Sequence, residues 1–225
     1  MFEVQEGGGL VIEWVVSLCD LTGHMVEPWV ENGYHALLID PQHKRGVHRE
    51  GSIVRVGQTI DHTHTWSTLR GIIKNDCVSF VAGFPPCTDL AVSGSRWFEE
   101  KGRKDWAFQF RAMEIVWQCH VIGQMSGAPW MVENPVSVIS SLWRKPDHSF
   151  SPSDFTAYDT NDNYNKKTML WTGGGFIMPK PRRDLLLSPP DDRIHRAPPN
   201  ADRANFRSAT PRGFARAVYE ANGEL

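Results

Sequence analysis

Short apolar runs alternate with stretches of helical periodicity along most of the chain. Five apolar runs have the length and composition of buried strands, at residues 10–20, 35–43, 52–60, 77–84 and 128–135. Three intervening segments carry apolar residues at helical spacing, at residues 22–34, 62–74 and 97–124. A late strand at 166–176 and a terminal helix at 208–222 complete the predicted elements.

Strands that alternate with helices over short links predict an α/β fold with a doubly wound, mostly parallel sheet. In such sheets ligands bind beyond the carboxyl ends of the strands. Four chemically active side chains stand at those predicted ends: Asp20, Asp40, Cys87 and Glu133. Cys19, in contrast, falls inside a predicted strand, as a core cysteine would. We therefore expect a functional site at this edge of the sheet.

The long helical pattern at residues 97–124 places large side chains on one side of the predicted helix. These side chains are Trp106, Phe110, Met113, Val116, Trp117 and His120. We interpret this side as facing the core.

The composition indicates a globular chain with an uneven charge distribution. The 225 residues allow one large domain, or one domain with a small appendage, and 40% apolar content can build a core. The net charge is -2, but residues 166–216 carry eleven Lys and Arg against four acids, or +7, which leaves about -9 elsewhere. This basic segment is either a surface for phosphate or a solvated connecting segment.

The cysteines and histidines do not predict a metal site. The four cysteines, Cys19, Cys77, Cys87 and Cys119, lack the close spacing of a zinc cluster. Asp61, His62 and His64 are ligand types, but a short pair of histidines is common on surfaces. Without a signal peptide or an apolar run near 18 residues, we expect a soluble, cytoplasmic protein with free thiols and no membrane partner.

Cys87 follows Pro85 and Pro86 on a turn directly after a predicted strand. It is either a small apolar residue in a tight turn or a nucleophile held on a rigid backbone. Glu133 comes from the neighbouring strand end, and a thiolate with a protonated carboxyl suits attack on an electron-poor ring. Glu133 could otherwise be a structural acid. Lys166 or Lys167 could contact the ring or a phosphate, or could simply be solvated.

Three motifs, in order, resemble those of the cytosine-5 DNA methyltransferases. They are CDLTG at 19–23, FPPC at 84–87 and ENP at 133–135. NKKTMLWTGG at 165–174 resembles the family's arginine-rich motif, and TPRGFARAVYEAN at 210–222 resembles its last motif, whose helix returns to the cofactor pocket. The resemblance covers nearly the whole chain and implies a Rossmann-like fold of the class I S-adenosylmethionine-dependent methyltransferases.

The resemblance implies a role for each matching residue. Cys87 would attack C6 of cytosine, Glu133 would contact N3 and the exocyclic amine, and Lys166 and Lys167 would complete the catalytic set. The expected contacts to S-adenosylmethionine are Asp20, Leu21, Thr22, Gly23, Asp40, Pro41, Asp61 and Pro85. Among these, Asp40 would bind the ribose hydroxyls, unless it only forms the turn before Pro41. Asp61 or Gln58 would meet the adenine.

Several positions depart from the family pattern. The opening loop runs Thr22-Gly23-His24-Met25, with one glycine where the family has several. Thr88 replaces a glutamine, Pro135 replaces a valine, and lysines replace the paired arginines before the late strand. These changes indicate a distant relative.

The domain boundaries follow from the resemblance. Residues 1–175 would form the catalytic α/β domain, and residues 206–225 a C-terminal helix that returns to it. Between them, a Pro- and Arg-rich insert at 176–205 replaces the family's target-recognition domain. So short an insert suggests weak or short sequence specificity, single-stranded DNA, or a partner protein that supplies recognition.

The function we expect is transfer of a methyl group from S-adenosylmethionine to C5 of cytosine in single- or double-stranded DNA. Short enzymes of this kind are typical of phages, so the cell would be a bacterium or a phage-infected host. Two alternatives remain open at this point. The substrate could be RNA or a free pyrimidine nucleotide, or the chain could bind cofactor or nucleic acid without turnover.

Overall fold

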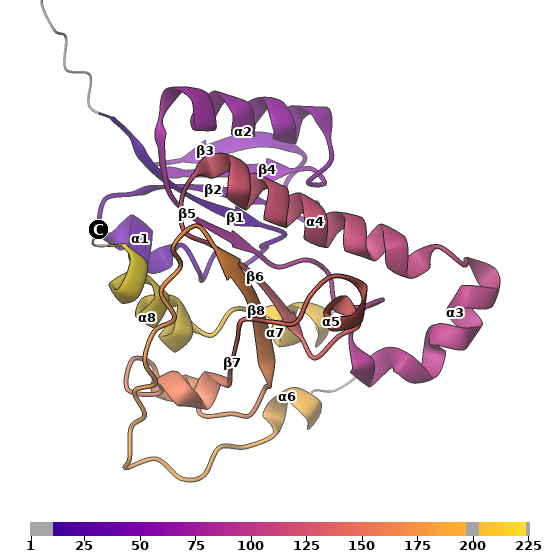
Figure 1. The fold of residues 1–225 in the computed structure, drawn as a ribbon. Coiled ribbons are helices and arrows are strands. Elements are labelled where there is room, and N and C mark those ends of the chain that lie inside the picture. The colour runs from indigo at the N-terminus through magenta and orange to yellow at the C-terminus, as the bar shows by residue number, and fades with distance from the viewer. Residues whose placement is uncertain (1–10, 197–202, 224–225) are drawn as a thin grey trace, which may run out of the picture.

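The protein is described by a computed structural model that covers residues 11–196 and 203–223 (Figure 1). Its strands form one sheet in the order β3-β4-β2-β1-β5-β6-β8-β7. Their bounds are β1 (Glu13–Leu18), β2 (His35–Ile39), β3 (Gly46–Glu50), β4 (Ile53–Gly57), β5 (Cys77–Gly83), β6 (Trp130–Pro135), β7 (His148–Phe150) and β8 (Thr168–Gly173). Residue 10, where the first strand was predicted to begin, lies outside the described residues.

Five neighbouring strands run parallel, in the order β4-β2-β1-β5-β6. In chain order this is 3-2-1-4-5 among the parallel strands, which is the doubly wound arrangement, and its topological switch point lies between β1 and β5. β3, β7 and β8 are antiparallel additions at the two edges. The predicted α/β, doubly wound, mostly parallel sheet is therefore confirmed.

Helices cover both faces of the sheet. Their bounds are α1 (Glu27–Glu31), α2 (Thr63–Asn75), α3 (Phe98–Lys104), α4 (Phe108–Ser126), α5 (Ile139–Leu142), α6 (Arg193–Arg196), α7 (Arg203–Ser208) and α8 (Arg212–Asn222). No helix in the described ranges is long and apolar enough to cross a membrane.

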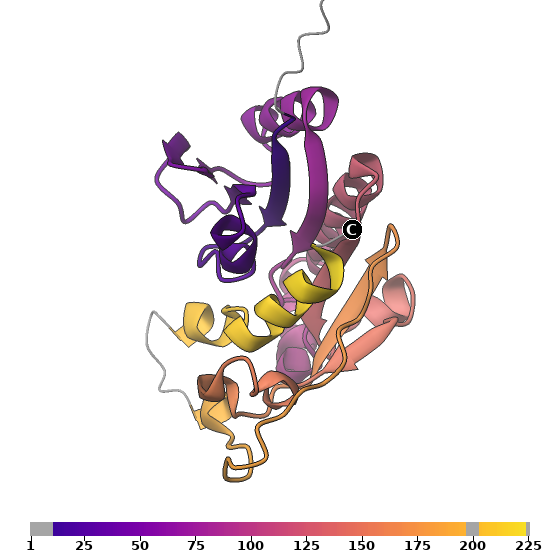
Figure 2. The ribbon, with the colours of Figure 1, turned by 90° about the vertical axis from the view of Figure 1, so that its left-hand side faces the viewer.

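Alternate residues of the strands face two separate cores. On β1, Trp14, Val16 and Leu18 pack with α2 and α4, whereas Val15 packs with α1 and α8 on the other face. Figure 2 shows this layering, with α4 on one side of the sheet and α1 with the yellow C-terminal helix on the other. Burial of both faces explains why the central strands are nearly continuous apolar runs.

The prediction of one continuous helix at residues 97–124 is wrong. A 3₁₀ turn (Val92–Trp97) and α3 precede α4, and the chain is extended at Asp105, whose Oδ1 accepts a hydrogen bond from Ala107 N at 3.1 Å. Because the break turns the first part away from the sheet, Trp106 is 81% exposed and Phe110 is 53% exposed. Neither is a core residue, although Met113 further along α4 is buried.

Smaller elements also differ from the prediction. Residues 46–50, where no element is predicted, form β3, an antiparallel edge strand against β4. Of the segment 22–34 that was predicted to be helical, only the five residues of α1 form an α-helix. Cys19 lies after β1 rather than inside it, with a left-handed φ of 57°. This turn returns Asp20 to the strand end, where Ser17 Oγ donates to its Oδ2 at 2.7 Å.

The C-terminal helix α8 is fixed to the body of the protein at its first turn. Gly213 N donates to Asp162 Oδ2 at 2.7 Å, and Asp162 itself is buried. Arg212 pairs with Glu27 of α1, and Arg216 with Glu31 at 2.8 Å. Asp162 therefore caps the helix that closes the second core.

Burial raises the pKa of Asp162 from 3.8 to about 6, although the bond from Gly213 opposes this shift. The folded protein thus binds more protons than the unfolded chain between these values, and its stability should fall by up to about 3 kcal/mol as pH rises through this window. Asp162→Asn keeps an acceptor for Gly213 and should flatten this dependence in urea denaturation at pH 4.5 and 7.5. The exposed Asp192→Asn is the control, and an unchanged slope in Asp162→Asn would contradict the assignment.

Candidate active site

The turn that carries Cys87 is held by both neighbouring strands. Phe84 N donates to Leu18 O of β1 at 2.9 Å, and Asn134 Nδ2 of β6 donates to Pro85 O at 2.9 Å. Pro85 is buried, and Cys87 is half-buried. The thiol is therefore placed by a backbone with little freedom, near the switch point of the sheet.

Glu133 and Lys166 lie together beside this turn. Lys166 Nζ is 3.7 Å from Glu133 Oε1, and each side chain is 13% exposed. Oε1 of Glu133 is buried and has no hydrogen-bond partner among the described residues. Burial raises the pKa of Glu133, and the charge of Lys166 opposes the shift. The site thus holds a carboxyl whose protonated form is stabilised relative to that of an exposed glutamate, and whose Oε1 faces the Lys166 ammonium without a hydrogen bond.

Neighbouring charges act on the Cys87 thiol in opposite directions. Burial and the carboxylate of Glu133 raise its pKa, whereas Lys166 and Arg207 lower it. The net shift is upward, so the thiol form predominates at neutral pH when no ligand is bound. Protonation of Glu133 removes its opposing charge and leaves two cations to stabilise the thiolate. The nucleophile and the acid are thus coupled.

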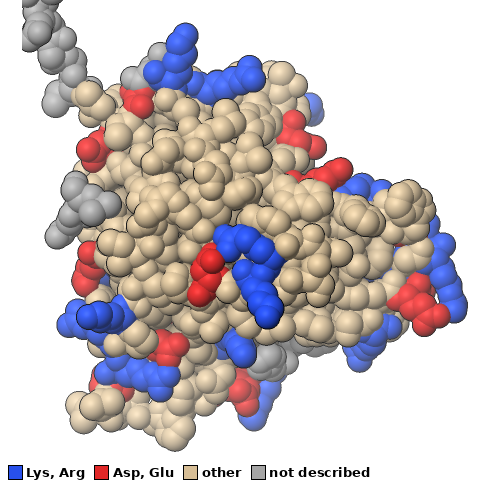
Figure 3. Space-filling model, viewed as in Figure 1, with Lys and Arg blue, Asp and Glu red and all other residues tan. Residues whose placement is uncertain are grey.

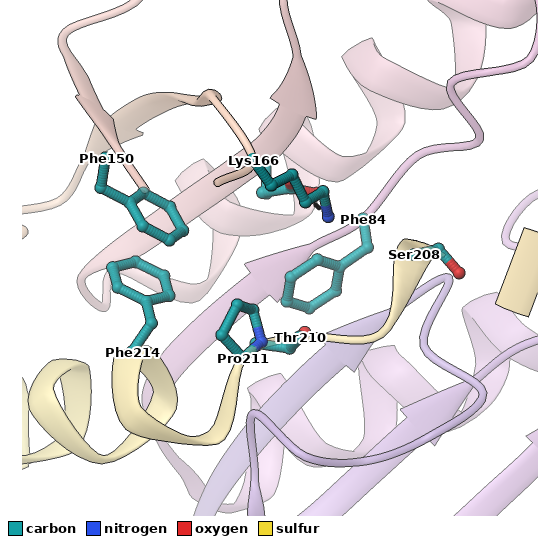
Figure 4. A pocket seen from close by; sticks show the side chains of 8 residues that line it. Phe84, Phe150, Lys166, Ser208, Thr210, Pro211 and Phe214 are labelled. Carbon is teal, nitrogen blue, oxygen red and sulfur yellow. Dashed lines mark ion pairs between the residues drawn. The ribbon is translucent and has the colours of Figure 1, made fainter. Parts of the chain in front are cut away.

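A pocket opens over Glu133 and Lys166 (Figure 4). Its empty volume, open solvent included, is about 200 Å³, and it is lined by Phe84, Glu133, Phe150, Lys166, Ser208, Thr210, Pro211 and Phe214. Phe150 and Phe214 stack with their ring centres 3.8 Å apart. The lining combines the aromatic rings of Phe84, Phe150 and Phe214 with the carboxyl of Glu133 and the ammonium of Lys166.

Asp20 organises the loop after β1 through hydrogen bonds to both of its carboxylate oxygens. Its Oδ1 accepts hydrogen bonds from Thr22 N at 3.0 Å and Gly23 N at 2.8 Å, and its Oδ2 accepts from Ser17. Gly23 has a left-handed φ of 74°. A buried carboxylate thus holds a loop that has only one glycine, and Asp20 is placed as a positioning residue.

The other predicted cofactor residues are spread over loops at the same edge of the sheet. Asp40 is buried directly after β2, its Oδ1 accepts from Gln42 N at 2.8 Å, and burial raises its pKa. Gln58 is half-buried after β4, whereas Pro41 and Asp61 are exposed. Because β4, β2 and β1 are adjacent, these loops form one continuous rim.

S-adenosylmethionine, the cofactor that the sequence resemblance implies, fits the chemistry of this rim. Its ribose hydroxyls need acceptors, which the carboxylate of Asp40 supplies at the end of the second parallel strand. Half-buried Leu21, beside exposed Thr22 and buried Gly23, adds apolar surface at the end of β1. Lys167, which was predicted together with Lys166 for the catalytic set, is exposed and has no side-chain partner among the described residues.

The C-terminal segment crosses the ends of the first two parallel strands. His24 Nδ1 lies 3.1 Å from Thr210 O, and the side-chain amides of Gln42 and Asn205 pair at 3.2 Å. Residues 205–211 therefore lie over the loops after β1 and β2. Arg207 reaches the site through this crossing, and no local sequence pattern predicts its position.

The histidines at the start of α2 have a structural explanation. His62 Nδ1 accepts a hydrogen bond from His64 N at 3.1 Å and caps the helix. Within the part of the chain that the structure describes, no group of three or more His, Cys, Asp or Glu side chains could hold a metal ion.

Asn134→Ala should lower both stability and turnover. The substitution leaves the Pro85 carbonyl without its donor, which should reduce the free energy of unfolding by about 1–3 kcal/mol. A loosened Cys87 turn should lower kcat about 10²-fold. Asn32→Ala removes a similar bond, from Asn32 Nδ2 to Pro28 O at 2.7 Å, far from the site. It should affect stability alone, and an unchanged kcat in Asn134→Ala would contradict the positioning role.

Comparisons with known proteins add a structural similarity. No family model matches the chain, and no curated protein matches it. Among solved structures, it is similar to a protein encoded within a prophage of E. coli, provisionally described as a DNA modification methyltransferase. The TM-score is 0.41 at 11% sequence identity, and the match covers 72% of this chain and 46% of that one. The chain thus spans less than half the length of that protein.

Proposed function

We propose that the protein transfers a methyl group from S-adenosylmethionine to C5 of cytosine in DNA, through a covalent adduct of Cys87. One observation carries the proposal: a half-buried thiol on a rigid turn lies within electrostatic range of a buried carboxyl whose pKa is raised and whose Oε1 has no hydrogen bond. A nucleophile beside a proton donor suits addition to a ring that gains electron density at nitrogen.

The residues of the site account for each bond change on the base. The Cys87 thiol loses its proton to water and its Sγ bonds to C6. The C5–C6 electron pair moves through C4 to N3, and N3 takes a proton from Glu133. S-adenosylmethionine would supply an electrophilic methyl group to C5, and its sulfur would keep the electron pair of the broken S–CH3 bond and leave as a neutral thioether. Glu133 recovers the N3 proton and C5 loses its own proton to water. The electron pair left at C5 re-forms the double bond and expels the Cys87 thiolate.

Lys166 balances the charge that this cycle moves. When Glu133 has given up its proton, its carboxylate lies 3.7 Å from the Lys166 ammonium. The opposite charge stabilises the ionised acid without a rigid hydrogen bond, so the proton can return. The aromatic side chains around Lys166 in Figure 4 limit the access of water to this exchange.

The cofactor would lie along the rim formed by the loops after β4, β2 and β1. The parallel strand order and its switch point support the class I methyltransferase fold. Asp40 would accept the ribose hydroxyls, Leu21, Thr22 and Gly23 would line the methionine end, and Pro85 would lie near the methyl group. Residues 1–175 would then form the catalytic domain, with residues 206–225 returning to it.

Three arginines in the described part of the basic insert at 176–205 are paired with acids, which reduces the charge that they offer for recognition. Arg183 pairs with Asp154, Arg193 pairs with Asp191 at 2.6 Å, and Arg182 lies 3.7 Å from Glu220. On the face in Figure 3, basic and acidic side chains lie side by side in the lower part of the molecule. We propose weak or short sequence specificity, single-stranded DNA, or a partner protein for recognition.

The test is methyl transfer from labelled S-adenosylmethionine to double-stranded DNA, single-stranded DNA and RNA in parallel. Digestion to nucleosides should place the label on 5-methylcytosine from DNA. If only RNA or a free pyrimidine nucleotide carries the label, then the substrate is RNA or that nucleotide and not DNA. If the protein binds the cofactor tightly but labels no substrate, it is a binding protein and not an enzyme.

A further inference from the structure

Arg207 of α7 is a half-buried cation without a counter-ion among the described residues. Its Nε is buried and has no hydrogen-bond partner, and its guanidinium makes no ion pair with any described residue. Arg212 and Arg216, a few residues later, both pair with acids of α1. Partial desolvation of a charge without a partner is unfavourable, so a ligand that supplies an anion would be favoured.

The position of Arg207 links this cation to the pocket. The next residue, Ser208, lines the pocket together with Glu133 and Lys166. The charge of Arg207 also reaches the Cys87 thiol and lowers its pKa. The groups that act on Cys87 are thus two cations, Lys166 and Arg207, against Glu133, whose protonation is favoured by burial. The site has an excess of positive charge beside a slot for a flat ring.

We propose that Arg207 binds the phosphate of the nucleotide whose base occupies the pocket. The inference rests on the proposed function, because it takes the ligand of the pocket to be a cytosine nucleotide. A guanidinium offers paired N–H donors that match two phosphate oxygens. The substrate class is then a nucleotide that carries its phosphate, as in a nucleic acid strand, and not a free base or nucleoside.

The experiment measures oligonucleotide binding without cofactor. The probes are a short single-stranded DNA with one cytosine and the same strand with neutral methylphosphonate linkages on both sides of that cytosine. Dissociation constants are compared for the wild type, Arg207→Gln, Arg207→Lys and Arg216→Gln. Arg216→Gln is the matched control, because it removes an equal charge from the exposed side of α8.

We expect neutral linkages to weaken wild-type binding about 10- to 100-fold. Arg207→Gln should bind the charged strand equally weakly and lose little more on the neutral one, because the two changes remove one shared contact. Arg207→Lys should recover part of the affinity, and Arg216→Gln should behave as the wild type. Equal losses on neutral linkages in the wild type and Arg207→Gln, or no binding of the charged strand, would overturn the proposal.

The two proposals fail in different ways. Binding that depends on Arg207 and on the phosphate, without any methyl transfer, would support the phosphate site and reject methylation. If methyl transfer occurs but the neutral linkages bind as well as the charged ones, only the role of Arg207 is rejected, and the proposed function stands.

Discussion

Methyl transfer should fall by more than about 10⁴-fold when Cys87 is replaced by alanine, because alanine has no electron pair for the covalent bond to C6 on which the proposed reaction depends. Cys87 is half-buried on a turn held by backbone and Asn134 hydrogen bonds, none of which uses its side chain. The variant should therefore keep its fold and its affinity for cofactor and DNA. Single-turnover label transfer, with binding measured separately, checks both parts.

Cys77→Ser is the matched control for this substitution. Cys77 is exposed at the start of β5, and Cys87 follows the end of the same strand. The control should retain wild-type turnover. If Cys87→Ala kept more than a tenth of the wild-type rate, the covalent mechanism would be wrong and Cys87 would be a turn residue.

Glu133→Gln should lower kcat by about 10²- to 10⁴-fold, the usual contribution of a positioned general acid. Glutamine has nearly the same shape but cannot pass a proton to N3. Burial holds the pKa of Glu133 above its ordinary value, so wild-type kcat should fall as pH rises through that pKa. The Gln variant should lack this alkaline limb, and pH profiles of both proteins from pH 5 to 9 test it.

Two further variants make the Glu133 test sharper. Glu114→Gln removes an exposed carboxyl from α4 and should leave the profile unchanged. Lys166→Met removes a charge that lowers the pKa of both Glu133 and Cys87, so the whole profile should move to higher pH. An alkaline limb that persists in Glu133→Gln would show that another group supplies the proton.

The edge of the sheet that carries the site could be predicted because apolar runs fix both the strands and their ends. A strand that is buried on both faces of the sheet is a nearly continuous apolar run, so it can be recognised in the sequence without knowing which strands pair with it. Asp40 and Cys87 both follow such runs, and Glu133 lies near the end of another. The structure brings Cys87 and Glu133 within electrostatic range of each other.

The broken helix could not be predicted from periodicity, because its apolar residues keep helical spacing across the break. Trp106 and Phe110 read as core-facing, and only the turn at Asp105 shows that they lie in solvent. In the same way, the edge strand β3 has a mixed burial pattern and no apolar run. The local pattern of apolar residues shows the helical or extended period of a segment, but tertiary packing determines where the helix or strand ends.

Contacts between distant parts of the chain could not be predicted from the sequence either. Phe150 and Phe214 are 64 positions apart, yet they stack to form one wall of the pocket. Arg207 reaches the site only because residues 205–211 cross the loops after β1 and β2. The Asp20 carboxylate was expected to face a cofactor, and the hydrogen bonds that occupy it depend on the left-handed turn at Cys19.

The most direct measurement is a trapping experiment with a cytosine whose C5 hydrogen is replaced by fluorine. Fluorine cannot leave as a cation, so the step that releases Cys87 is blocked after methyl transfer. Incubation of such an oligonucleotide with the protein and S-adenosylmethionine, followed by denaturation and peptide mass spectrometry, should find the DNA joined to Cys87. An adduct on another residue, or none while ordinary DNA is methylated, would contradict the mechanism.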